Sequence, residues 1–351
     1  MQLTGKKLLV TGARSPIALA LMQQFIEAGN RVWTTDSVPF ALSKHLAGIE
    51  GFTQTAPCRF DPHAFIADIN EQIEDFGIDL IIPTNEETFW LSRFRADLEA
   101  PLFAADFEIM AVLHHKEHYA RVLNAAGLKT PKAYDEHGED RILKDYYSRF
   151  TALGDGNDQL PHFYQQKISG KEWCLSAVAE KGKMQVGIVY DKEINFRGSS
   201  SILIGNHDRP DILAALEKLI DFTDFTGLIG CDVIESDQDG ELYFIDINPR
   251  GTSGLVLLTP EFWSEGKLTF QKPRRTNIAL LPYFFKHPFQ TQKIFANSES
   301  YFKGIAVKHP FFLQLNQVWN WWRYSKREHI NFRQATVYDI EWDGEGVDDK
   351  E

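Results

Sequence analysis

The strongest chemical signal in the sequence is a set of oxygen-bearing side chains on one predicted β-hairpin. Residues 228–235 are rich in Ile, Val and Cys, residues 236–240 form a polar cluster that ends in Gly, and a strand pattern resumes over residues 241–247. A polar cluster between two such runs predicts two antiparallel strands joined by a turn. Carboxylates on these strands are therefore expected to have fixed positions relative to one another.

A symmetric turn over residues 236–240 places Asp232 opposite Phe244 and makes Asp246 its diagonal neighbour, roughly 7–8 Å away. Because strand side chains alternate, Phe244, Asp246 and Asn248 then share the face that carries Asp232. Carboxylate and amide oxygens suit hard divalent cations such as Mg²⁺. The alternative interpretation is a hairpin with a solvated polar face.

This hairpin resembles the metal-binding end of the ATP-grasp superfamily, where the run is usually Glu-x-Asn-Pro-Arg and a further ligand lies one strand upstream. Here the run is Asp246-Ile247-Asn248-Pro249-Arg250, with Asp232 on the upstream strand. The resemblance implies that Asp232, Asp246 and Asn248 bind Mg²⁺, with Mn²⁺ as an alternative, and that Arg250 is catalytic. Asp246 replaces the usual Glu, and its shorter side chain is less suited to bridging two ions.

The resemblance covers roughly residues 1–258. It implies a chain of α/β and α+β class, with an N-terminal Rossmann-like pre-ATP-grasp domain followed by a two-lobed ATP-grasp fold. The implied domains are residues 1–113 (Rossmann-like), 114–168 (small lobe with the adenine hinge), 169–258 (large lobe with the metal site) and 259–351 (a helical, aromatic C-terminal layer that completes the large lobe).

The activity implied is that of an ATP-dependent, ADP-forming carboxylate–amine ligase, similar to the large subunit of carbamoyl-phosphate synthases. Such enzymes phosphorylate a carboxylate, and an amine or similar nucleophile attacks the acyl-phosphate. Phosphoryl transfer depends on positioning and charge neutralisation more than on a covalent nucleophile, which fits these residue types. The implied partners are small-molecule acids and amines, and a homodimer is compatible with them. A non-catalytic, nucleotide-binding relative is the first alternative.

Lys116 lies where the superfamily places a lysine that contacts ATP phosphates, in a helix predicted from His114 to Ala126 and ended by Gly127. The alternative is a zinc site, because His114 and His118 are four residues apart. No glutamate motif of a zinc protease accompanies them.

Lys144, in a short strand-like run, resembles the second nucleotide lysine of the superfamily, and we assign it a catalytic role as well. The Gly-rich loop that usually follows is replaced by residues 146–150, which contain no glycine. Ser148 and Arg149 are the phosphate donors expected instead, Arg149 through its charged fork. The alternative for Arg149 is an exposed cation.

The stretch Gln165, Gln166, Lys167 and Ile168 resembles the adenine hinge, where backbone groups bind the edge of the base. Gln166 replaces the usual Glu, which matters little if the backbone makes the contacts. Glu172 is expected to accept hydrogen bonds from the ribose hydroxyls, since a carboxylate can accept from two adjacent O–H donors. The alternative for Glu172 is a surface position on a strand.

The N-terminal residues predict a strand over 6–10, a turn at Gly12, a helix over 17–28 and a second strand over 31–35 that ends at Asp36. This strand–helix–strand unit predicts a parallel sheet. An NAD(P)-dependent Rossmann enzyme, with Asp36 on a ribose, is the second alternative function. The three-glycine fingerprint of such a site is absent.

Glu86 follows a predicted strand over residues 78–84, at the start of the next helix. Ligands gather at the carboxyl ends of parallel strands, so a ligand role for Glu86 is one interpretation. Capping of the helix is the interpretation that we favour, because a carboxylate stabilises a helix N-terminus.

Bulk composition narrows the class of protein. The chain has 351 residues, 43% of them hydrophobic, and a net charge of −12. That charge and the lack of a long basic run argue against nucleic acid. The three cysteines lie far apart, which predicts reduced, buried thiols. No apolar run reaches membrane-spanning length, and we expect a cytoplasmic protein without a membrane partner.

The C-terminal region carries aromatic and basic clusters, the densest at residues 319–324. Two interpretations are open. A helix with this composition can lie on a membrane surface. We favour the other interpretation, in which the aromatic residues pack a helical layer onto the protein's own sheet.

Overall fold

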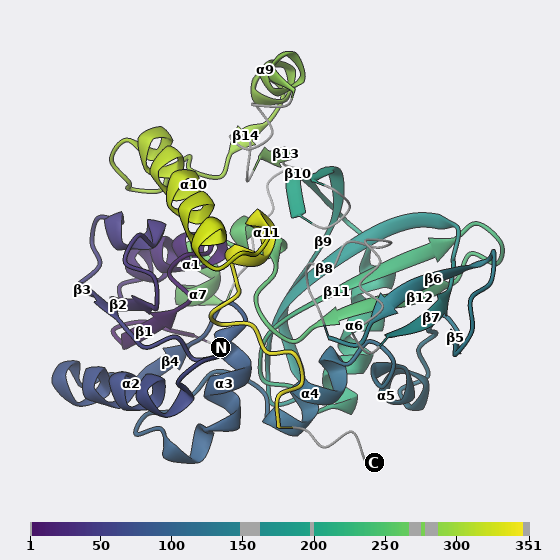
Figure 1. Cartoon of the computed structure of the whole chain (residues 1–351), viewed down its shortest axis with the longest axis horizontal. Helices are drawn as coiled ribbons and strands as arrows, with labels where there is room; N and C mark the ends of the chain where they lie inside the picture. The colour runs from purple at the N-terminus through teal and green to yellow at the C-terminus, as the bar shows by residue number, and fades with distance from the viewer. Residues whose placement is uncertain (1, 148–161, 197–199, 267–274, 278–286, 347–351) are drawn as a thin grey trace.

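Figure 1 shows the fold of the chain in a computed structural model, which describes residues 2–147, 162–196, 200–266, 275–277 and 287–346. Among these residues, the N-terminal part contains a sheet of four parallel strands in the order β3-β2-β1-β4. The strands are β1 Lys7–Thr11, β2 Arg31–Asp36, β3 Gly51–Gln54 and β4 Leu80–Ile82. They alternate with α1 Pro16–Glu27, α2 Pro62–Phe76 and α3 Glu87–Arg93, and with the short 3-10 helices η1 Leu42–His45 and η2 Arg95–Asp97.

This alternation confirms the predicted strand–helix–strand unit. Leu8, Leu9 and Val10 of β1 have no exposed surface, as expected for a parallel strand that is covered on both faces. Helix α1 begins after Ser15, whose Oγ accepts a hydrogen bond from the N–H of Ala18 at 3.0 Å. Strand β3 escaped prediction because it is a short edge strand of partly exposed residues.

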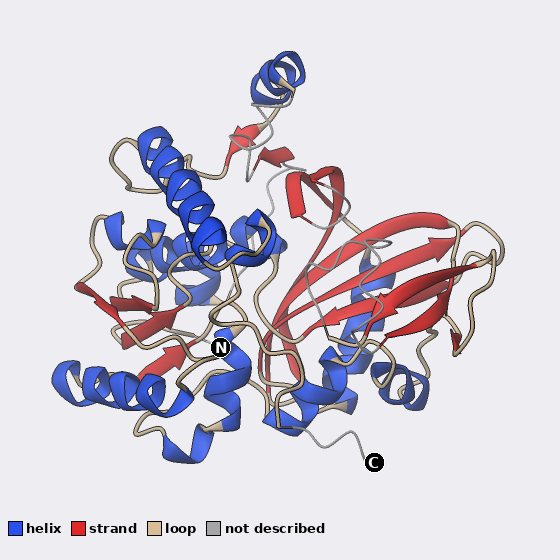
Figure 2. Cartoon of the chain, viewed as in Figure 1, coloured by secondary structure: helices blue, strands red, loops and turns tan. Residues whose placement is uncertain are grey.

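Beyond the parallel sheet, most of the described strands form antiparallel sheets (Figure 2). Within the described ranges, one sheet has the order β12-β11-β8-β9-β10-β13-β14 and the other the order β5-β7-β6, and only β13 and β14 pair in parallel. The strands are β5 Ala133–Tyr134, β6 Arg141–Asp145, β7 His162–Gln166, β8 Gly170–Glu180, β9 Lys183–Phe196, β10 Ser200–His207, β11 Gly227–Ser236, β12 Leu242–Asn248, β13 Arg275–Asn277 and β14 Glu299–Ser300. Helix α6 Pro210–Phe222 packs on β9 and β8. The predicted α/β and α+β class is confirmed.

Two short helices, α4 Phe107–His114 and α5 Tyr119–Ala125, link the parallel sheet to the antiparallel ones. The single helix predicted from His114 to Ala126 is therefore wrong. At the break, His115 Nδ1 accepts hydrogen bonds from the N–H groups of Glu117 and His118, at 3.2 and 3.1 Å. A side chain that binds nearby backbone groups competes with helical hydrogen bonding, which explains the interruption.

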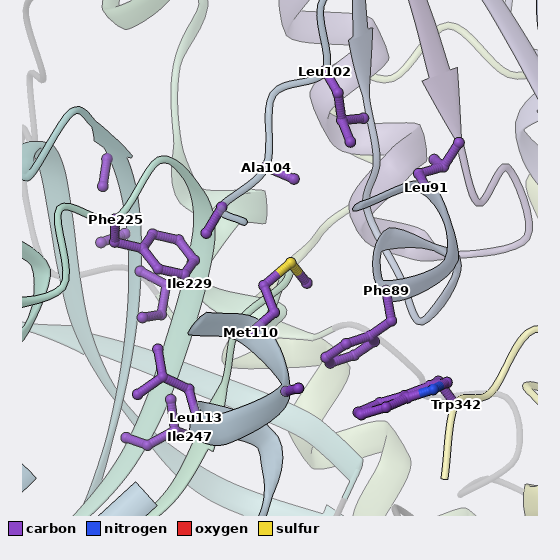
Figure 3. Close-up of a cluster of buried hydrophobic side chains, with 14 of the residues drawn as sticks. Phe89, Leu91, Leu102, Ala104, Met110, Leu113, Phe225, Ile229, Ile247 and Trp342 are labelled. Carbon is purple, nitrogen blue, oxygen red and sulfur yellow. The ribbon is translucent and has the colours of Figure 1, made fainter. Parts of the chain in front are cut away.

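One hydrophobic core joins the two halves of the protein (Figure 3). It contains Phe89 of α3, Leu113 of α4, and Ile229 and Ile247 of the β11–β12 hairpin. Trp342 closes the cluster, with its ring stacked on that of Phe89 at 5.2 Å between centroids. The hairpin that carries the candidate metal ligands is therefore fixed against the N-terminal domain by a shared core.

The C-terminal segment contains η3 Ser253–Leu257, α7 Pro260–Glu265, α9 Pro288–Ala296, α10 Pro310–Arg327 and α11 Phe332–Ala335. Helix α7 packs on α1, where Trp263 contacts Phe25 with ring centroids 4.6 Å apart. Towards the end of the described residues, Asp339 forms an ion pair with Arg14. The segment also adds β13 to the edge of the large sheet, so it contacts both halves. The predicted domain boundaries stay a proposal.

The aromatic residues of α10 do not all pack inward, so the favoured packing interpretation is wrong for most of them. Trp321 is buried and contacts Phe40, with ring centroids 4.7 Å apart. Phe312 and Trp319, in contrast, are 69% and 57% exposed, and Trp322 is 44% exposed. In the described part of the chain, α10 meets the N-terminal domain through the face that carries Trp321 and Gln317, whose Nε2 donates to the carbonyl of Arg14.

Cys58, Cys174 and Cys231 are free and buried, as predicted. In the part of the chain that the structure describes, no helix combines the length and apolar character needed to span a membrane.

Arg14 is the centre of a buried ion-pair network that ties the chain end to β2. Its guanidinium lies 2.6 Å from Asp36 Oδ1 and 2.6 Å from Asp339 Oδ1. Burial raises the pKa of the Asp339 carboxyl, but Arg14 outweighs this effect and holds that pKa below its usual value.

We expect Asp339→Asn to reduce the free energy of unfolding by about 2 kcal/mol, because it removes a charged partner of a buried guanidinium. Chemical denaturation at neutral pH measures the loss. A carboxylate with a lowered pKa stabilises above its unfolded pKa, so the difference should shrink as the pH falls and Asp339 of the native protein becomes protonated. Asp237→Asn, in the exposed turn of the β11–β12 hairpin, is the control. A pH-independent difference would contradict the charge argument.

Candidate functional site

The β11–β12 hairpin places Asp232 directly opposite Asp246, not diagonal to it as predicted. The turn closes one residue away from the symmetric register, so that Glu235 pairs with Leu242. A further register shift between Asp232 and Val233 leaves Ile245 as an extra residue on β12. Such a β-bulge moves every later residue of its strand by one position.

The bulge decides which side chains share a face. A one-residue slip moves a strand's side chains to the opposite face, and the second shift at Ile245 moves Asp246 and Asn248 back to the face of Asp232. Phe244 precedes the bulge, pairs with Val233 and is buried in the core. The prediction that Phe244 shares the acidic face is therefore wrong, while Asp232, Asp246 and Asn248 lie together.

The bulge also positions Lys144. An extra residue interrupts the ladder, and the carbonyl oxygen of Ile245 accepts a hydrogen bond from Lys144 Nζ at 2.7 Å. Desolvation lowers the pKa of Lys144 to about 8, against the opposing effect of Asp246. Lys144 therefore lies on β6 of the smaller sheet but reaches the acidic hairpin of the larger one.

Lys116 lies in the turn between α4 and α5, where its backbone N–H donates to the carbonyl oxygen of Tyr146 at 2.8 Å. The Lys116 side chain is close enough for its positive charge to contribute to the lowered pKa values of Lys144 and His114. The two lysines predicted to contact phosphates are therefore brought together, although the helix predicted for Lys116 is absent. The zinc alternative at His114 and His118 gains no support, because no group of three potential metal ligands among the described residues includes a histidine.

Hydrogen bonds link Asp246 to Asn248 and Asn248 to Arg250. Asp246 Oδ2 accepts from Asn248 Nδ2 at 3.3 Å, and Asn248 Oδ1 accepts from Arg250 Nη2 at 2.8 Å. The amide oxygen thus faces Arg250, and ligation of a metal beside Asp246 requires the amide to turn over. The donor set of two carboxylates and an amide is otherwise the hard-oxygen chemistry that Mg²⁺ prefers.

Arg250 is buried, and its Nε lies 2.6 Å from Oε1 of Glu86, which is also buried. Glu86 is the residue that precedes α3, as the capping interpretation expects, but its side chain makes no capping hydrogen bond to that helix. The pair joins the candidate site to the carboxyl end of β4 in the N-terminal domain. Glu86 is therefore part of the site through Arg250.

The hinge residues are only partly available for a base. The N–H groups of Gln166 and Lys167 already donate to the carbonyls of Lys132 and Asp140, both at 2.8 Å. In the described part of the chain, the Ile168 N–H makes no backbone hydrogen bond. Gln165 is buried and its Nε2 donates to Tyr119 Oη at 3.2 Å. Of the predicted hinge donors, Ile168 N–H fits the role best.

Glu172 lies on β8, on the same face as Cys174 and next to Asp232 of β11. Ligand atoms of these three side chains lie within 4.8 Å of one another. Burial raises the pKa of the Cys174 thiol well above its usual value, so it is protonated and not a ligand for a hard cation.

Lys192 of β9, which sequence reasoning missed, binds two members of this group. Its Nζ lies 2.9 Å from Glu172 Oε1 and 3.0 Å from Asp232 Oδ2. The predicted strand ended at Tyr190, but β9 continues to Phe196. Extending the alternation by two residues would have placed Lys192 on the same face as Tyr190.

Two predicted phosphate donors, Ser148 and Arg149, lie outside the described residues. The nicotinamide alternative meets a physical obstacle. Asp36, its ribose acceptor, is already bound by Arg14. Gly12 has a φ of 71°, and a Cβ there would lie 2.7 Å from Glu87 Oε1. The Glu87 side chain, whose Oε1 accepts hydrogen bonds from Thr11 Oγ1 and the Thr84 N–H, thus fills the space beside the turn.

Residues 114–254 match the family model described as the ATP-grasp domain. No curated protein matches the chain. The solved structures that it resembles include N5-carboxyaminoimidazole synthetase from Staphylococcus aureus complexed with ADP, with a TM-score of 0.59 and 14% identity over 82% of this chain and 87% of that chain.

A second similar structure is the biotin carboxylase domain of 2-oxoglutarate carboxylase from Hydrogenobacter thermophilus, in complex with MgADP, ADP and bicarbonate. Its TM-score is 0.58, with 14% identity over 73% of this chain and 66% of that chain. A third is L-amino acid ligase from Bacillus licheniformis, with a TM-score of 0.55 and 14% identity over 70% and 68% of the two chains. In other cases the chain spans as little as 26% of the matching structure.

At these identities the likeness to solved structures concerns the fold alone. The fold is a parallel α/β domain joined to antiparallel sheets that meet at a polar hairpin. Together with the family match, it confirms the predicted resemblance: residues 114–254 of this chain are an ATP-grasp domain.

Proposed function

We propose that the protein is a Mg²⁺-dependent, ADP-forming ligase that activates a small-molecule carboxylate for attack by an amine or similar nucleophile. The observation that carries this proposal is the direct pairing of Asp232 with Asp246 beside Asn248 and Lys144. The similar structures support it, because two contain ADP and a third is an L-amino acid ligase. A cytoplasmic location is part of the proposal.

In the proposed reaction, a carboxylate oxygen of the acid attacks the γ-phosphorus of ATP, and the bond from that phosphorus to the β-phosphate oxygen breaks. ADP leaves with the electron pair. The amine then attacks the acyl carbon, loses a proton and expels inorganic phosphate. Magnesium, when bound, neutralises the charge that builds up on the phosphate oxygens. Asp232, Asp246 and Asn248 would hold it.

The cationic side chains take the remaining roles. Lys116 and Lys144 would bind the phosphates, and Arg250 would steady the transferring phosphoryl group or the acyl-phosphate oxygens. The Ile168 N–H and Glu172 would bind adenine and ribose. Preorganised donors of this kind lower the barrier without forming a covalent bond to the protein.

The test is a screen of acid and amine pairs for release of ADP and phosphate. The proposal requires release above background only when a matching acid and amine are both present. Calorimetry with MgATP separates the alternatives. Tight binding without turnover on any pair would favour a non-catalytic nucleotide-binding relative, and quenching of NADH fluorescence without ATP binding would favour a nicotinamide enzyme.

We expect ADP to bind more weakly as the pH rises through about 8, because Lys144, with a pKa lowered to about 8, loses its charge there. Losing one charge-assisted hydrogen bond to phosphate corresponds to roughly a tenfold rise in Kd. Titration calorimetry between pH 7 and pH 9 measures the change. Lys144→Arg keeps its charge over this range and should flatten the profile. An equally steep profile in that variant would assign the effect to another group.

A further inference from the structure

Lys192 lies in the middle of the proposed nucleotide site. Cys174 pairs with Tyr190 across β8 and β9, and Asp232 pairs with Cys174 across β11 and β8. Since side chains two residues apart share a face, Lys192 and Glu172 lie on the same face as this row. The ammonium is largely buried, with 11% of the Lys192 side chain exposed.

The two partners of Lys192 have different proposed tasks. Glu172 is the proposed acceptor for the ribose, and Asp232 is a proposed metal ligand. One ammonium, 2.9 Å from the first carboxylate and 3.0 Å from the second, therefore spans the distance between the sugar end and the metal end of the site. In a bound nucleotide, the phosphate that lies between the ribose and the metal-bound phosphates is the α-phosphate.

Asp232 is the partner of the Lys192 ammonium in this structure and is also a proposed ligand of the divalent ion. In the present arrangement its charge is compensated by Lys192, and this contact helps to hold the pKa of Asp232 below its usual value despite burial. A divalent ion bound at Asp232 and Asp246 would neutralise the charge of Asp232 in place of Lys192. The ion would also repel the Lys192 ammonium. A lysine side chain is long and flexible, with three donors, so it can turn to a neighbouring anion.

We infer that Lys192 is an internal counter-cation that opposes metal binding while the nucleotide is absent and becomes a ligand of the α-phosphate when the nucleotide arrives. This inference rests on the proposed function. It makes binding of the metal depend on binding of the nucleotide, because Asp232 is released at the moment when the ammonium gains a phosphate partner. Coupling of this kind is reciprocal between the two ligands.

The experiment measures two affinities for each variant of the full-length protein. Binding of Mn²⁺ without nucleotide is followed by electron paramagnetic resonance, and binding of ADP at saturating Mg²⁺ by calorimetry. Lys192→Met keeps the apolar stem and removes the charge. We expect it to bind Mn²⁺ about tenfold more tightly, since a like charge within contact distance is gone, and ADP about tenfold more weakly, since one charge-assisted contact is lost.

Two further variants serve as controls. Lys183→Met, at the exposed start of the same strand, should leave both affinities unchanged. Lys192→Arg keeps the charge and should restore the low affinity for Mn²⁺. Circular dichroism checks that each variant is folded. If Lys192→Met is poorly folded, the comparison is made between Lys192→Arg and Lys192→Gln.

The opposite signs of the two effects distinguish the inference from a structural role. A lysine that merely holds the carboxylates in place would weaken both affinities when it is replaced, and this result would overturn the inference, as would two unchanged affinities. Failure of the proposed function gives a different result. In that case the wild-type protein does not bind ADP, while tighter Mn²⁺ binding by Lys192→Met would still identify the counter-cation.

Discussion

Replacing Asp246 with alanine is expected to lower ATP turnover by at least about 1,000-fold, which corresponds to about 4 kcal/mol of transition-state stabilisation. The position explains the size of the effect. Asp246 pairs with Asp232 across the hairpin and accepts a hydrogen bond from Asn248, so it lies between the two other proposed metal ligands. Without it, a single carboxylate and an amide remain, and that set is too weak to hold Mg²⁺ against water.

The measurement is ADP release with the matched acid and amine, together with the unfolding midpoint. Asn248→Ala should also abolish turnover, because the amide oxygen is the third expected ligand. Both variants should keep their fold, because the side chains of Asp246 and Asn248 are only partly buried. Asp237→Ala, in the turn of the same hairpin, is the matched control and should be fully active. Normal turnover in both Asp246→Ala and Asn248→Ala would refute the metal assignment.

Much of the fold could be predicted from local patterns. The parallel unit at the N-terminus follows from an apolar run, a turn at Gly12 and an amphipathic helix. The hairpin of β11 and β12 follows from two strand patterns around a polar cluster. In both cases the signal lies within a dozen residues, which is the range over which periodicity is informative.

The register of the hairpin could not be predicted in the same way. The bulge at Ile245 depends on contacts from distant segments, since its carbonyl binds Lys144 and the N–H of Phe244 donates to the carbonyl of Lys129. These contacts come from the other lobe. The predicted set of Asp232, Asp246 and Asn248 is nevertheless preserved. Each one-residue shift moves side chains to the opposite face of the sheet, so the second shift returns Asp246 and Asn248 to the face of Asp232.

Long-range pairs escaped prediction for the same reason. Glu86 and Arg250 are 164 residues apart, and nothing in either neighbourhood marks the other as its partner. Lys192 lies among charged residues that are typical of a solvated strand end. The aromatic residues of α10 show the opposite error, since Trp319 and Trp322 resemble core residues in composition but are exposed.

The Glu86–Arg250 pair gives the second large prediction. Removing one member of a buried ion pair leaves a charge in a poorly solvated place, which typically costs about 3–5 kcal/mol of unfolding free energy. We therefore expect both Arg250→Met and Glu86→Leu to be strongly destabilised. The pair also joins two parts of the protein, α3 of the N-terminal domain and the end of β12, so the loss should appear as lower cooperativity of unfolding as well.

The double variant separates stability from activity. With both charges gone, no uncompensated charge remains, and a good part of the stability should return, because apolar residues often replace a buried ion pair without net loss. Turnover should not return if Arg250 steadies the transferring phosphoryl group, since that task needs a cation in the site. Chemical denaturation and ADP release, measured on the two single variants and the double variant, form a complete thermodynamic cycle. Recovery of both properties would show that Arg250 is needed only to neutralise Glu86, and recovery of neither would show that the pair orders the site as a unit.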